Sequence, residues 1–321
     1  MNKVFIIAEI GSNHDQSLKK AKKLIKIAKD CGADAVKFQL FKGTELYPDD
    51  IKIQKIIKKF ELNPKWIDIL NHYAKKLKII ILYSAFDVSY QKLLLNKGIK
   101  YHKIASSEVV KFEILELFKN KKLNIFLSTG MCDLDDVVKA YRILKNNNLV
   151  IMQCSSLYPC NDENVNLNVI KLYKKKFRNV EVGFSDHTTT DTAALVALGL
   201  GARYFEKHIT ENKKNKGPDH FYAYEPKEFI NYVKNLRSGM ISLGSKNKEI
   251  LPLEKKNGRR LGIYSKIAIK KNEIIKKKHI YFKFPAIGLR DKEINQVLNK
   301  KSKININKNK PIFSKMVYNE K

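Results

Sequence analysis

Short apolar runs alternate with longer amphipathic stretches from the start of the chain to about residue 244. The apolar runs are Val4–Ala8, Ala35–Phe38, Ile79–Tyr83, Tyr101–Ala105, Asn124–Leu127, Val150–Cys154, Val180–Phe184 and Arg203–Lys207. Apolar residues recur at helical spacing in Ser17–Cys31, Pro64–Leu77, Val88–Asn96, Phe112–Phe118, Leu134–Lys145, Leu167–Phe177, Thr189–Leu200 and Pro226–Ser242. Buried strands alternating with helices are typical of a parallel sheet covered on both faces. Eight such units favour a closed (β/α)8 TIM barrel, an α/β fold, over an open doubly wound sheet.

The alternation ends after residue 244, and the chain divides there. Residues 245–258 are rich in Lys, Glu and Asn and are predicted to form a linker. Residues 259–321 contain shorter strand-like pieces, namely Leu261–Ile269, Glu273–Ile275, Ile280–Phe284 and Pro311–Val317. They predict a small, mainly β domain, and a domain of about 60 residues buries little surface on its own. We therefore expect it to dock on a barrel of the kind formed by residues 1–244.

The chain is strongly basic, with a formal net charge of +31 at pH 7 over 321 residues. Lys supplies most of this charge and is spread over the whole length. Recognition of nucleic acid usually concentrates Arg and aromatic residues in one patch. We interpret the charge as a compositional bias toward Lys and expect no nucleic-acid partner. A positive field also attracts acidic, phosphorylated substrates.

The cysteines and the N-terminus bear on the compartment. Cys31, Cys132, Cys154 and Cys160 are far apart and include no C-x-x-C pair, so we expect reduced thiols. The first apolar run is soon followed by Glu9. It is therefore too short for a signal peptide, or for a membrane span of about 20 apolar residues. The predicted location is cytoplasmic, without membrane association.

Polar residues gather where the predicted strands end, and in a (β/α)8 barrel those ends line the active site. In chain order they are Glu9, Asn13, His14, Lys37, Gln39, Lys103, Ser106, Glu108, Ser128, Thr129, Gly130, Tyr158, Ser185, Asp186, His187, His208, Asp219 and His220. Two of them, Lys37 and Lys103, stand among three serines, a combination of point charges and hydroxyl donors suited to phosphate. Apolar strand residues flank both lysines, and an unpaired ammonium there would be costly. We therefore predict an anion site rather than two solvated side chains.

Two further pairs carry candidate chemistry. His187 and His208 end neighbouring strands, so their imidazoles are candidate ligands of one divalent metal ion. The alternative is that they are merely hydrogen-bonded in the core. Glu9 and Glu108 are candidate proton donors and acceptors. The alternative for these carboxylates is structural ion pairing with the two lysines, and both roles can hold together.

Seven segments resemble motifs of the sialic acid synthase family, the N-acetylneuraminate synthases and their relatives, and occur in the family's order. They are AEIGSNH at 8–14, ADAVKFQ at 33–39, KIASSE at 103–108, LSTGM at 127–131, GFSDHT at 183–188, EKH at 206–208 and GPDH at 217–220. Near the C-terminus, Ile269–Ile275 resembles part of the family's antifreeze-like (SAF) domain. Each motif alone is weak, but jointly they are specific.

The resemblance implies a synthase that condenses phosphoenolpyruvate with an N-acyl amino-sugar aldehyde, either N-acetylmannosamine or a di-N-acetyl deoxyhexose, with C–O cleavage and phosphate release. It implies that phosphoenolpyruvate is held by Lys37, Lys103, Ser106, Ser128 and Ser185, with Gln39 nearby. It implies that His187 and His208 bind a divalent ion, that Glu108 acts around the metal-bound water, and that the sugar faces Glu9, Tyr158 and Asp219. Asn13 and Ser156 complete the predicted substrate-binding set. The expected ion is Mn²⁺, with Mg²⁺ or Co²⁺ as alternatives, and the expected assembly is a domain-swapped homodimer.

The chain departs from the family's pattern on the sugar side. Gln153 replaces the His of the family's H-C-T-x-x-Y-P segment, and Ser156 stands where Asn is frequent. Phe284 occupies the position of an Arg that reaches the sugar's N-acyl group, and Arg290 is a candidate replacement. Phe221–Tyr224 is bulkier than the family's usual residues. We therefore expect unchanged phosphoenolpyruvate chemistry with an altered acceptor, leading to a legionaminic- or pseudaminic-type acid.

Two alternatives stay open at this point. One is another phosphoenolpyruvate-dependent sugar-acid synthase that uses a phosphorylated aldose, although such an enzyme would not need an antifreeze-like domain. The other is a non-catalytic carbohydrate- or nucleic-acid-binding protein, which predicts that acids or metal ligands are missing from the site. The candidate acids, lysines and histidines are all present, and this favours the synthase.

Overall fold

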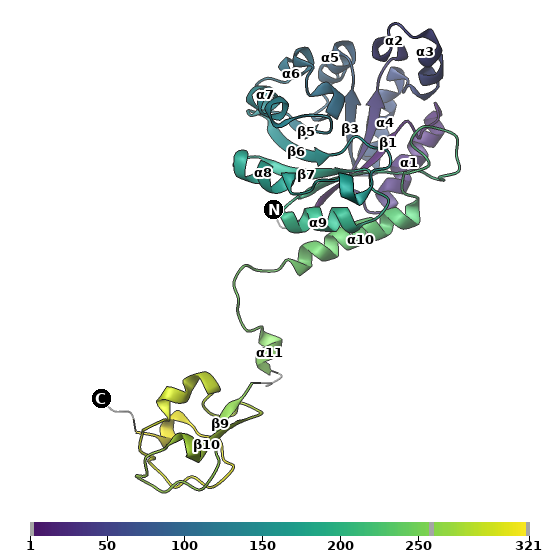
Figure 1. The fold of residues 1–321 in the computed structure, drawn as a ribbon. Helices are drawn as coiled ribbons and strands as arrows, with labels where there is room; N and C mark the ends of the chain where they lie inside the picture. The colour runs from purple at the N-terminus through teal and green to yellow at the C-terminus, as the bar shows by residue number, and fades with distance from the viewer. Residues whose placement is uncertain (1–2, 257–259, 319–321) are drawn as a thin grey trace. The chain divides into compact units, whose positions relative to one another are not determined.

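The structure of the chain, a computed structural model, describes residues 3–256 and 260–318 and contains two compact units, residues 1–244 and 245–321. The first unit is a closed barrel of eight parallel strands that pair in chain order (Figure 1). The strands are β1 (Phe5–Gly11), β2 (Ala35–Leu40), β3 (Ile80–Ala85), β4 (Tyr101–Ile104), β5 (Asn124–Ser128), β6 (Asn148–Cys154), β7 (Glu181–Asp186) and β8 (Tyr204–His208). β1 closes the barrel against β8, with Phe5 opposite Tyr204 and Glu9 opposite His208. The predicted (β/α)8 barrel is confirmed.

The helices that alternate with the strands cover the outside of the barrel (Figure 1). They are α1 (Leu18–Asp30), α4 (Ile67–Lys76), α5 (Val88–Asn96), α6 (Phe112–Glu116), α7 (Leu134–Leu144), α8 (Val169–Lys176), α9 (Thr192–Leu200) and α10 (Pro226–Ser242). Local capping sets several of their starts. Ser17 accepts a hydrogen bond from the Lys20 amide before α1, and Asp133 and Asp136 form a capping box before α7. No helix in the described ranges combines the length and hydropathy needed to span a bilayer.

The connection between β2 and β3 contains helices that the apolar pattern did not predict. They are α2 (Gly43–Leu46) and α3 (Ile51–Ile57). α3 buries none of its residues, so its isoleucines do not join the barrel core. Asp50 caps its first turn instead, by accepting a hydrogen bond from the Ile53 amide at 2.9 Å. α4 starts later than predicted, because Pro64–Trp66 forms a separate 3-10 turn.

An apolar layer inside the barrel sets the depth of the polar site. It consists of Ile7, Ala35, Leu82, Phe126, Val150 and Met152, with Phe5, Ile80, Tyr101 and Tyr204 packed against it. Side chains alternate between the two faces of a strand, so inward positions recur every second residue. The next inward positions toward the carboxyl ends are Glu9, Lys37, Ser84, Lys103, Ser128, Cys154, Ser185 and Glu206. The barrel therefore has an apolar floor with a polar layer directly above it.

The second unit has a small apolar core of its own. It contains α11 (Pro252–Lys256) and the antiparallel strands β9 (Gly262–Ser265) and β10 (Ile280–Lys283). The core residues are Ile263, Ile269, Ile275, Ile280, Leu289, Val297, Ile306, Ile312 and Val317.

The prediction of a mainly β second domain overstated its strands. The predicted strands at 273–275 and 311–317 contain only isolated β-bridges, for example at Ile274 and Pro311. Turns at Asn272 and Asn309, where φ is positive, break up the pairing. The predicted linker, residues 245–258, contains the short helix α11, and its last two residues lie outside the described ranges.

Candidate active site

The carboxyl ends of the barrel strands open onto a cavity of about 520 Å³. The predicted site residues that line it are Lys37, Gln39, Lys103, Ser106, Ser128, Ser156, Tyr158, Ser185, His187, His208 and Asp219. The lining also includes Ser84, Phe86, Ala105, Ser107, Met131, Cys154, Glu206 and Tyr222. Residues from β2 to β8 and the loops that follow them therefore share one chamber.

Three predicted site residues lie behind this lining. Glu9 Oε1 accepts a hydrogen bond from Gln39 Nε2 at 2.8 Å, and Glu108 Oε1 accepts one from Ser107 Oγ at 2.8 Å. Each of these carboxyl groups thus touches a residue of the lining. Asn13 donates to the backbone carbonyl of the first residue after β8, at 3.0 Å, and so joins two loops.

Other strand-end residues singled out from the sequence support the frame of the site. Asp186 lies 3.0 Å from Lys207 Nζ, and both side chains are buried. Thr129 Oγ1 donates to the Met152 carbonyl at 2.9 Å. These contacts join neighbouring strands at their carboxyl ends, and so they fix the spacing of the side chains that face the cavity.

Glu206 on β8 lies at the centre of the charged layer and was not among the predicted site residues. Its Oε1 lies 2.8 Å from Lys37 Nζ and 3.8 Å from Lys103 Nζ. The same oxygen accepts a hydrogen bond from Ser185 Oγ at 3.1 Å. Lys37 Nζ also lies 3.3 Å from Glu9 Oε2. The structural pairing considered for Glu9 is therefore present, and Glu206 links both lysines.

The mutual charges of this cluster determine its ionisation. Burial alone would raise the pKa of Glu206, but Lys103 and Lys37 lower it to about 2. Burial lowers the pKa of Lys103 to about 8, and Glu206 opposes this effect. Burial would also lower the pKa of Lys37, but Glu206 and Glu9 raise it above its usual value. At pH 7 both ammonium groups are therefore charged. Their combined positive charge is larger than the single negative charge of the Glu206 carboxylate.

Hydroxyl groups beside the lysines are available to a ligand. Ser84 Oγ and Ser128 Oγ are buried and have no hydrogen-bond partner among the described residues. Buried hydroxyls are normally paired, so these two are candidate donors to a bound anion. Gly130 keeps the region open, because a Cβ there would come within 2.3 Å of Ser156 Oγ. Free hydroxyls next to two ammonium groups are donors suited to an oxyanion.

A second group of lining residues offers hydroxyl, carboxylate and aromatic surfaces. Asp219 accepts hydrogen bonds from Tyr222 OH at 2.9 Å and from Ser12 Oγ at 3.0 Å. The rings of Tyr158 and Tyr222 lie 5.6 Å apart, centroid to centroid. Gly11 has a φ of +52°, and a Cβ at this position would lie 2.8 Å from Asp219 Oδ2. Glycine thus lets the Asp219 carboxylate approach the end of β1.

His187 and His208 have the properties of a pair of metal ligands. Their ring centroids lie 5.6 Å apart. His187 Nδ1 lies 2.8 Å from the Ser155 carbonyl oxygen, which can only accept, so the lone pair of a neutral imidazole is on Nε2. Burial lowers the pKa of His208 to about 3, which keeps this ring neutral. Burial would lower the pKa of His187, but Cys154 and the hydrogen bond to Ser155 raise it above its usual value. A divalent ion binds the neutral form of both rings, oriented by a second hydrogen bond. Within the described residues no group of three His, Cys, Asp or Glu could hold one, so this pair would need further ligands from substrate and water.

Glu9 and Glu108 have carboxyl pKa values near neutrality. Burial raises the pKa of Glu9 to about 7, against the opposing charge of Lys37. Burial also raises the pKa of Glu108 to about 7, against the Ser107 hydrogen bond and the charge of Lys111. Glu108 lies 3.6 Å from Lys111 Nζ, so its ion pair differs from the expected one with Lys37 or Lys103. A carboxyl group with a pKa near 7 can both give and take protons at neutral pH.

Replacing Glu108→Gln is expected to stabilise the barrel at alkaline pH. The folded-state pKa of about 7 lies above the usual 4.5, so the stability given by protonated Glu108 is fully present below pH 4.5. It is lost as the pH rises through 7. Because Gln does not ionise, the variant should gain up to about 3 kcal/mol relative to the parent between pH 5 and pH 8. Urea unfolding at both pH values measures this gain. The same difference in unfolding free energy between variant and parent at pH 5 and at pH 8 would contradict it.

Eight lining residues were missing from the predicted site, among them Glu206, Ser84 and Tyr222. Glu206 precedes His208 by two positions on β8, so the alternation of the strand placed both on the inner face. Ser84 on β3 lies two positions after Leu82 of the apolar floor, so it too is on the inner face. Tyr222 belongs to a loop, and its contact with Asp219 depends on tertiary packing that no local pattern encodes.

The fold and the cavity define a (β/α)8 barrel with a candidate active site at the carboxyl ends of its strands. The sequence profile of the NeuB family matches residues 24–248 of the chain. The chain belongs to the NeuB family.

Known proteins agree with this assignment. The chain is 34% identical over 322 residues to N,N'-diacetyllegionaminic acid synthase of Campylobacter jejuni, with 94% of this chain and 96% of that protein covered. It is 31% identical over 333 residues to human N-acetylneuraminate-9-phosphate synthase, with 98% and 93% covered. The crystal structure of N-acetylneuraminic acid (sialic acid) synthetase from Leptospira borgpetersenii, in complex with citrate, matches with a TM-score of 0.75 at 30% identity, covering 79% of this chain and 90% of that one. The family resemblance expected from the motifs is confirmed.

Proposed function

We propose that this protein is a nonulosonic acid synthase that condenses phosphoenolpyruvate with an N-acyl amino-sugar aldehyde. The observation that carries the proposal is the buried cluster of Lys37, Lys103 and Glu206 beside unpartnered serine hydroxyls. Membership of the NeuB family supports the same reaction. The names of the relatives support a sialic-acid-type product.

The lysines and serines hold phosphoenolpyruvate. Its phosphoryl and carboxylate groups are anionic, and ammonium groups with hydroxyl donors are matched partners for them. Glu206 contacts both lysines and so fixes where their Nζ atoms lie. A preorganised pair of charges binds the enol phosphate in one orientation, with its reactive carbon toward the acceptor.

The reaction joins two carbons and releases phosphate. The enol π electrons of carbon 3 form the new bond to the aldehyde carbon, while positive charge develops at carbon 2. Water adds at carbon 2, and the C–O bond to phosphate then breaks with its electron pair leaving on phosphate. The water loses one proton as it adds and its second as the ketone forms; one proton goes to the aldehyde oxygen and the other to the released phosphate. We assign these transfers to Glu9 and Glu108, because a pKa near 7 suits both directions at neutral pH.

A divalent ion would be held by His187 and His208, with Mn²⁺ as the first candidate and Mg²⁺ or Co²⁺ as alternatives. Such an ion would supply Lewis-acid polarisation of the acceptor carbonyl. The contribution of this chain is to orient the two rings. The Ser155 carbonyl contacts His187, and Tyr222 OH lies 3.3 Å from His208 Nδ1.

The acceptor is a neutral amino sugar without a phosphate group. Lys37 and Lys103 are the only Lys or Arg side chains among the described residues that line the cavity, and phosphoenolpyruvate uses both. The remaining lining includes Gln39, Asp219 and Tyr222, whose polar groups suit sugar hydroxyl and amide groups. Asp219 would repel a second phosphate, and such repulsion discriminates between substrates. The proposed acceptors are N-acetylmannosamine and a di-N-acetyl deoxyhexose.

We further propose that residues 259–321 form a SAF domain and that the protein acts in the cytoplasm as a domain-swapped homodimer. The resemblance of Ile269–Ile275 and the small core of this unit support the proposal. Arg290, the candidate for the family's sugar-binding Arg, lies 3.4 Å from Glu293 in the structure. Its role toward the sugar stays a prediction.

Phosphate release over a panel of acceptors tests the proposed function. With phosphoenolpyruvate present, an unphosphorylated N-acyl amino sugar should support release. Its kcat/KM should exceed that of N-acetylmannosamine 6-phosphate by about tenfold or more, since each added unfavourable charge contact costs on the order of 1 kcal/mol or more. Faster release with a phosphorylated aldose, or release that needs no acceptor, would contradict the proposal.

A further inference from the structure

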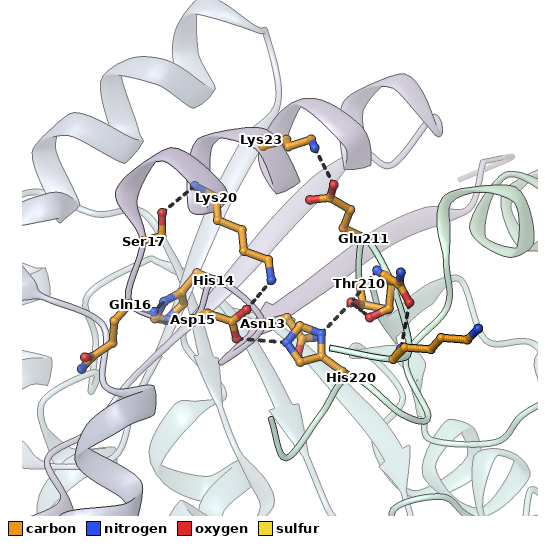
Figure 2. Close-up of polar contacts among 12 residues, drawn as sticks. Asn13, His14, Asp15, Gln16, Ser17, Lys20, Lys23, Thr210, Glu211 and His220 are labelled. Atoms are coloured by element: carbon orange, nitrogen blue, oxygen red, sulfur yellow. Dashed lines mark hydrogen bonds and ion pairs between the residues drawn. The ribbon is translucent and has the colours of Figure 1, made fainter. Parts of the chain in front are cut away.

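Two loops meet beside the cavity, residues 12–17 after β1 and residues 209–225 after β8. Their contact is a latch formed by Asp15, His220 and Thr210 (Figure 2). His220 Nε2 donates to Asp15 Oδ1 at 3.0 Å, and His220 Nδ1 lies 2.6 Å from Thr210 Oγ1. The His220 and Thr210 side chains are fully buried. The latch thus joins the start and the end of the barrel above the β1–β8 seam.

The first loop is held in a strained conformation around this latch. Asp15 has a φ of 47° and Gln16 a φ of 51°, both in the left-handed region that non-glycine residues rarely adopt. Lys20 of α1 forms an ion pair with Asp15 (Figure 2). Burial would raise the pKa of Asp15, but Lys20 and His220 lower it, so this carboxylate is charged at neutral pH. Backbone strain of this kind persists where the surroundings enforce it, and it concentrates at functional sites.

The second loop carries Asp219, which lies next to His220 and lines the cavity. Ser12 of the first loop donates to Asp219 Oδ2 at 3.0 Å, so the latch and this contact join the same two loops. The turn is packed against the imidazole, because a Cβ on Gly217 would lie 2.8 Å from His220 Cδ2. A shift of the buried imidazole would therefore move the neighbouring carboxylate.

We propose that the latch positions Asp219 for acceptor binding and that Asp15 and His220 are positioning residues of this enzyme. The inference rests on the proposed function, since that function assigns Asp219 to the acceptor. The order carboxylate, imidazole, hydroxyl matches that of a hydrolytic triad. Because Thr210 and His220 are fully buried, substrate does not reach them, and the group acts by holding the loops together.

Steady-state kinetics of Asp15→Asn and His220→Gln, with phosphoenolpyruvate and an N-acyl amino sugar, test the latch. Each variant should raise KM for the acceptor by about tenfold or more, because small misplacements of binding groups have effects of this order. KM for phosphoenolpyruvate should stay within about twofold, since its lysines lie on other strands. The double variant should be little worse than His220→Gln alone, because both changes break one contact. Glu211→Gln is the matched control, as it removes an exposed ion pair with Lys23 between the second loop and α1 (Figure 2).

The two substrates separate positioning from a general role in folding. Equal rises of both KM values, with a lower unfolding temperature, would overturn the latch proposal, and so would an unchanged KM for the acceptor. If His220→Gln does not fold, Asp15→Asn decides the question. Asp15 is about a third exposed, and the Asp15→Asn variant retains the buried imidazole of His220. A parent protein that releases no phosphate with any acceptor would instead refute the proposed function.

Discussion

Replacing Lys103→Met is expected to lower kcat/KM for phosphoenolpyruvate by about 1000-fold or more. Lys103 is buried and supplies one of two ammonium charges to the anion site. Truncating one member of a desolvated charge pair costs about 2 to 5 kcal/mol, and 1000-fold corresponds to about 4 kcal/mol. Initial rates of phosphate release measure the loss, and calorimetric titration with phosphoenolpyruvate separates weaker binding from slower chemistry.

Lys42→Met is the matched control for this experiment. Lys42 also follows a barrel strand, but it donates to Ser89 Oγ at the surface and does not line the cavity. Its kcat/KM should stay within about threefold of the parent value, because exposed polar contacts contribute little. Equal losses in the two variants would show that general charge, rather than the buried pair, attracts the substrate. A fully active Lys103→Met protein would remove the basis of the anion site.

Chelation is expected to reduce turnover by about 100-fold or more, and added Mn²⁺ should restore it. The reason is that His187 and His208 offer imidazoles oriented by hydrogen bonds, and an ion bound there would contribute several kcal/mol of charge stabilisation. His187→Ala should weaken Mn²⁺ binding to the protein without substrates, which electron paramagnetic resonance measures directly.

His72→Ala provides the control for metal binding, since His72 is an exposed residue of α4. It should bind Mn²⁺ as the parent does. Full turnover after exhaustive treatment with EDTA would contradict the metal assignment. It would leave the two histidines as hydrogen-bonding residues, which was the alternative kept for them.

The barrel and most of its lining could be predicted from sequence because they depend on local, repetitive patterns. Apolar runs mark the strands, and the residues after them reach the cavity whatever the details of packing. Lys37, Lys103 and His208 were found in this way. The motifs then specified the family, whose sequence profile matches the chain.

The missing parts of the prediction depend on contacts between distant segments. Glu206 was overlooked because its role comes from side chains on β2 and β4, although strand alternation pointed to it. The latch joins residues about 200 positions apart, so no local sequence pattern predicts the contact between Asp15 and His220. α3 is only seven residues long and buries none of them, and the strands of the second unit are too short to produce a clear alternation.

The most direct measurement is a crystal structure of the protein grown with phosphoenolpyruvate. It should show the anionic oxygens of this molecule within hydrogen-bonding distance of Lys37 Nζ and Lys103 Nζ, and of the unpartnered Ser84 and Ser128 hydroxyls. Phosphoenolpyruvate bound elsewhere, with the lysines still paired only to Glu206 and Glu9, would contradict the assignment of this cavity as the site of condensation.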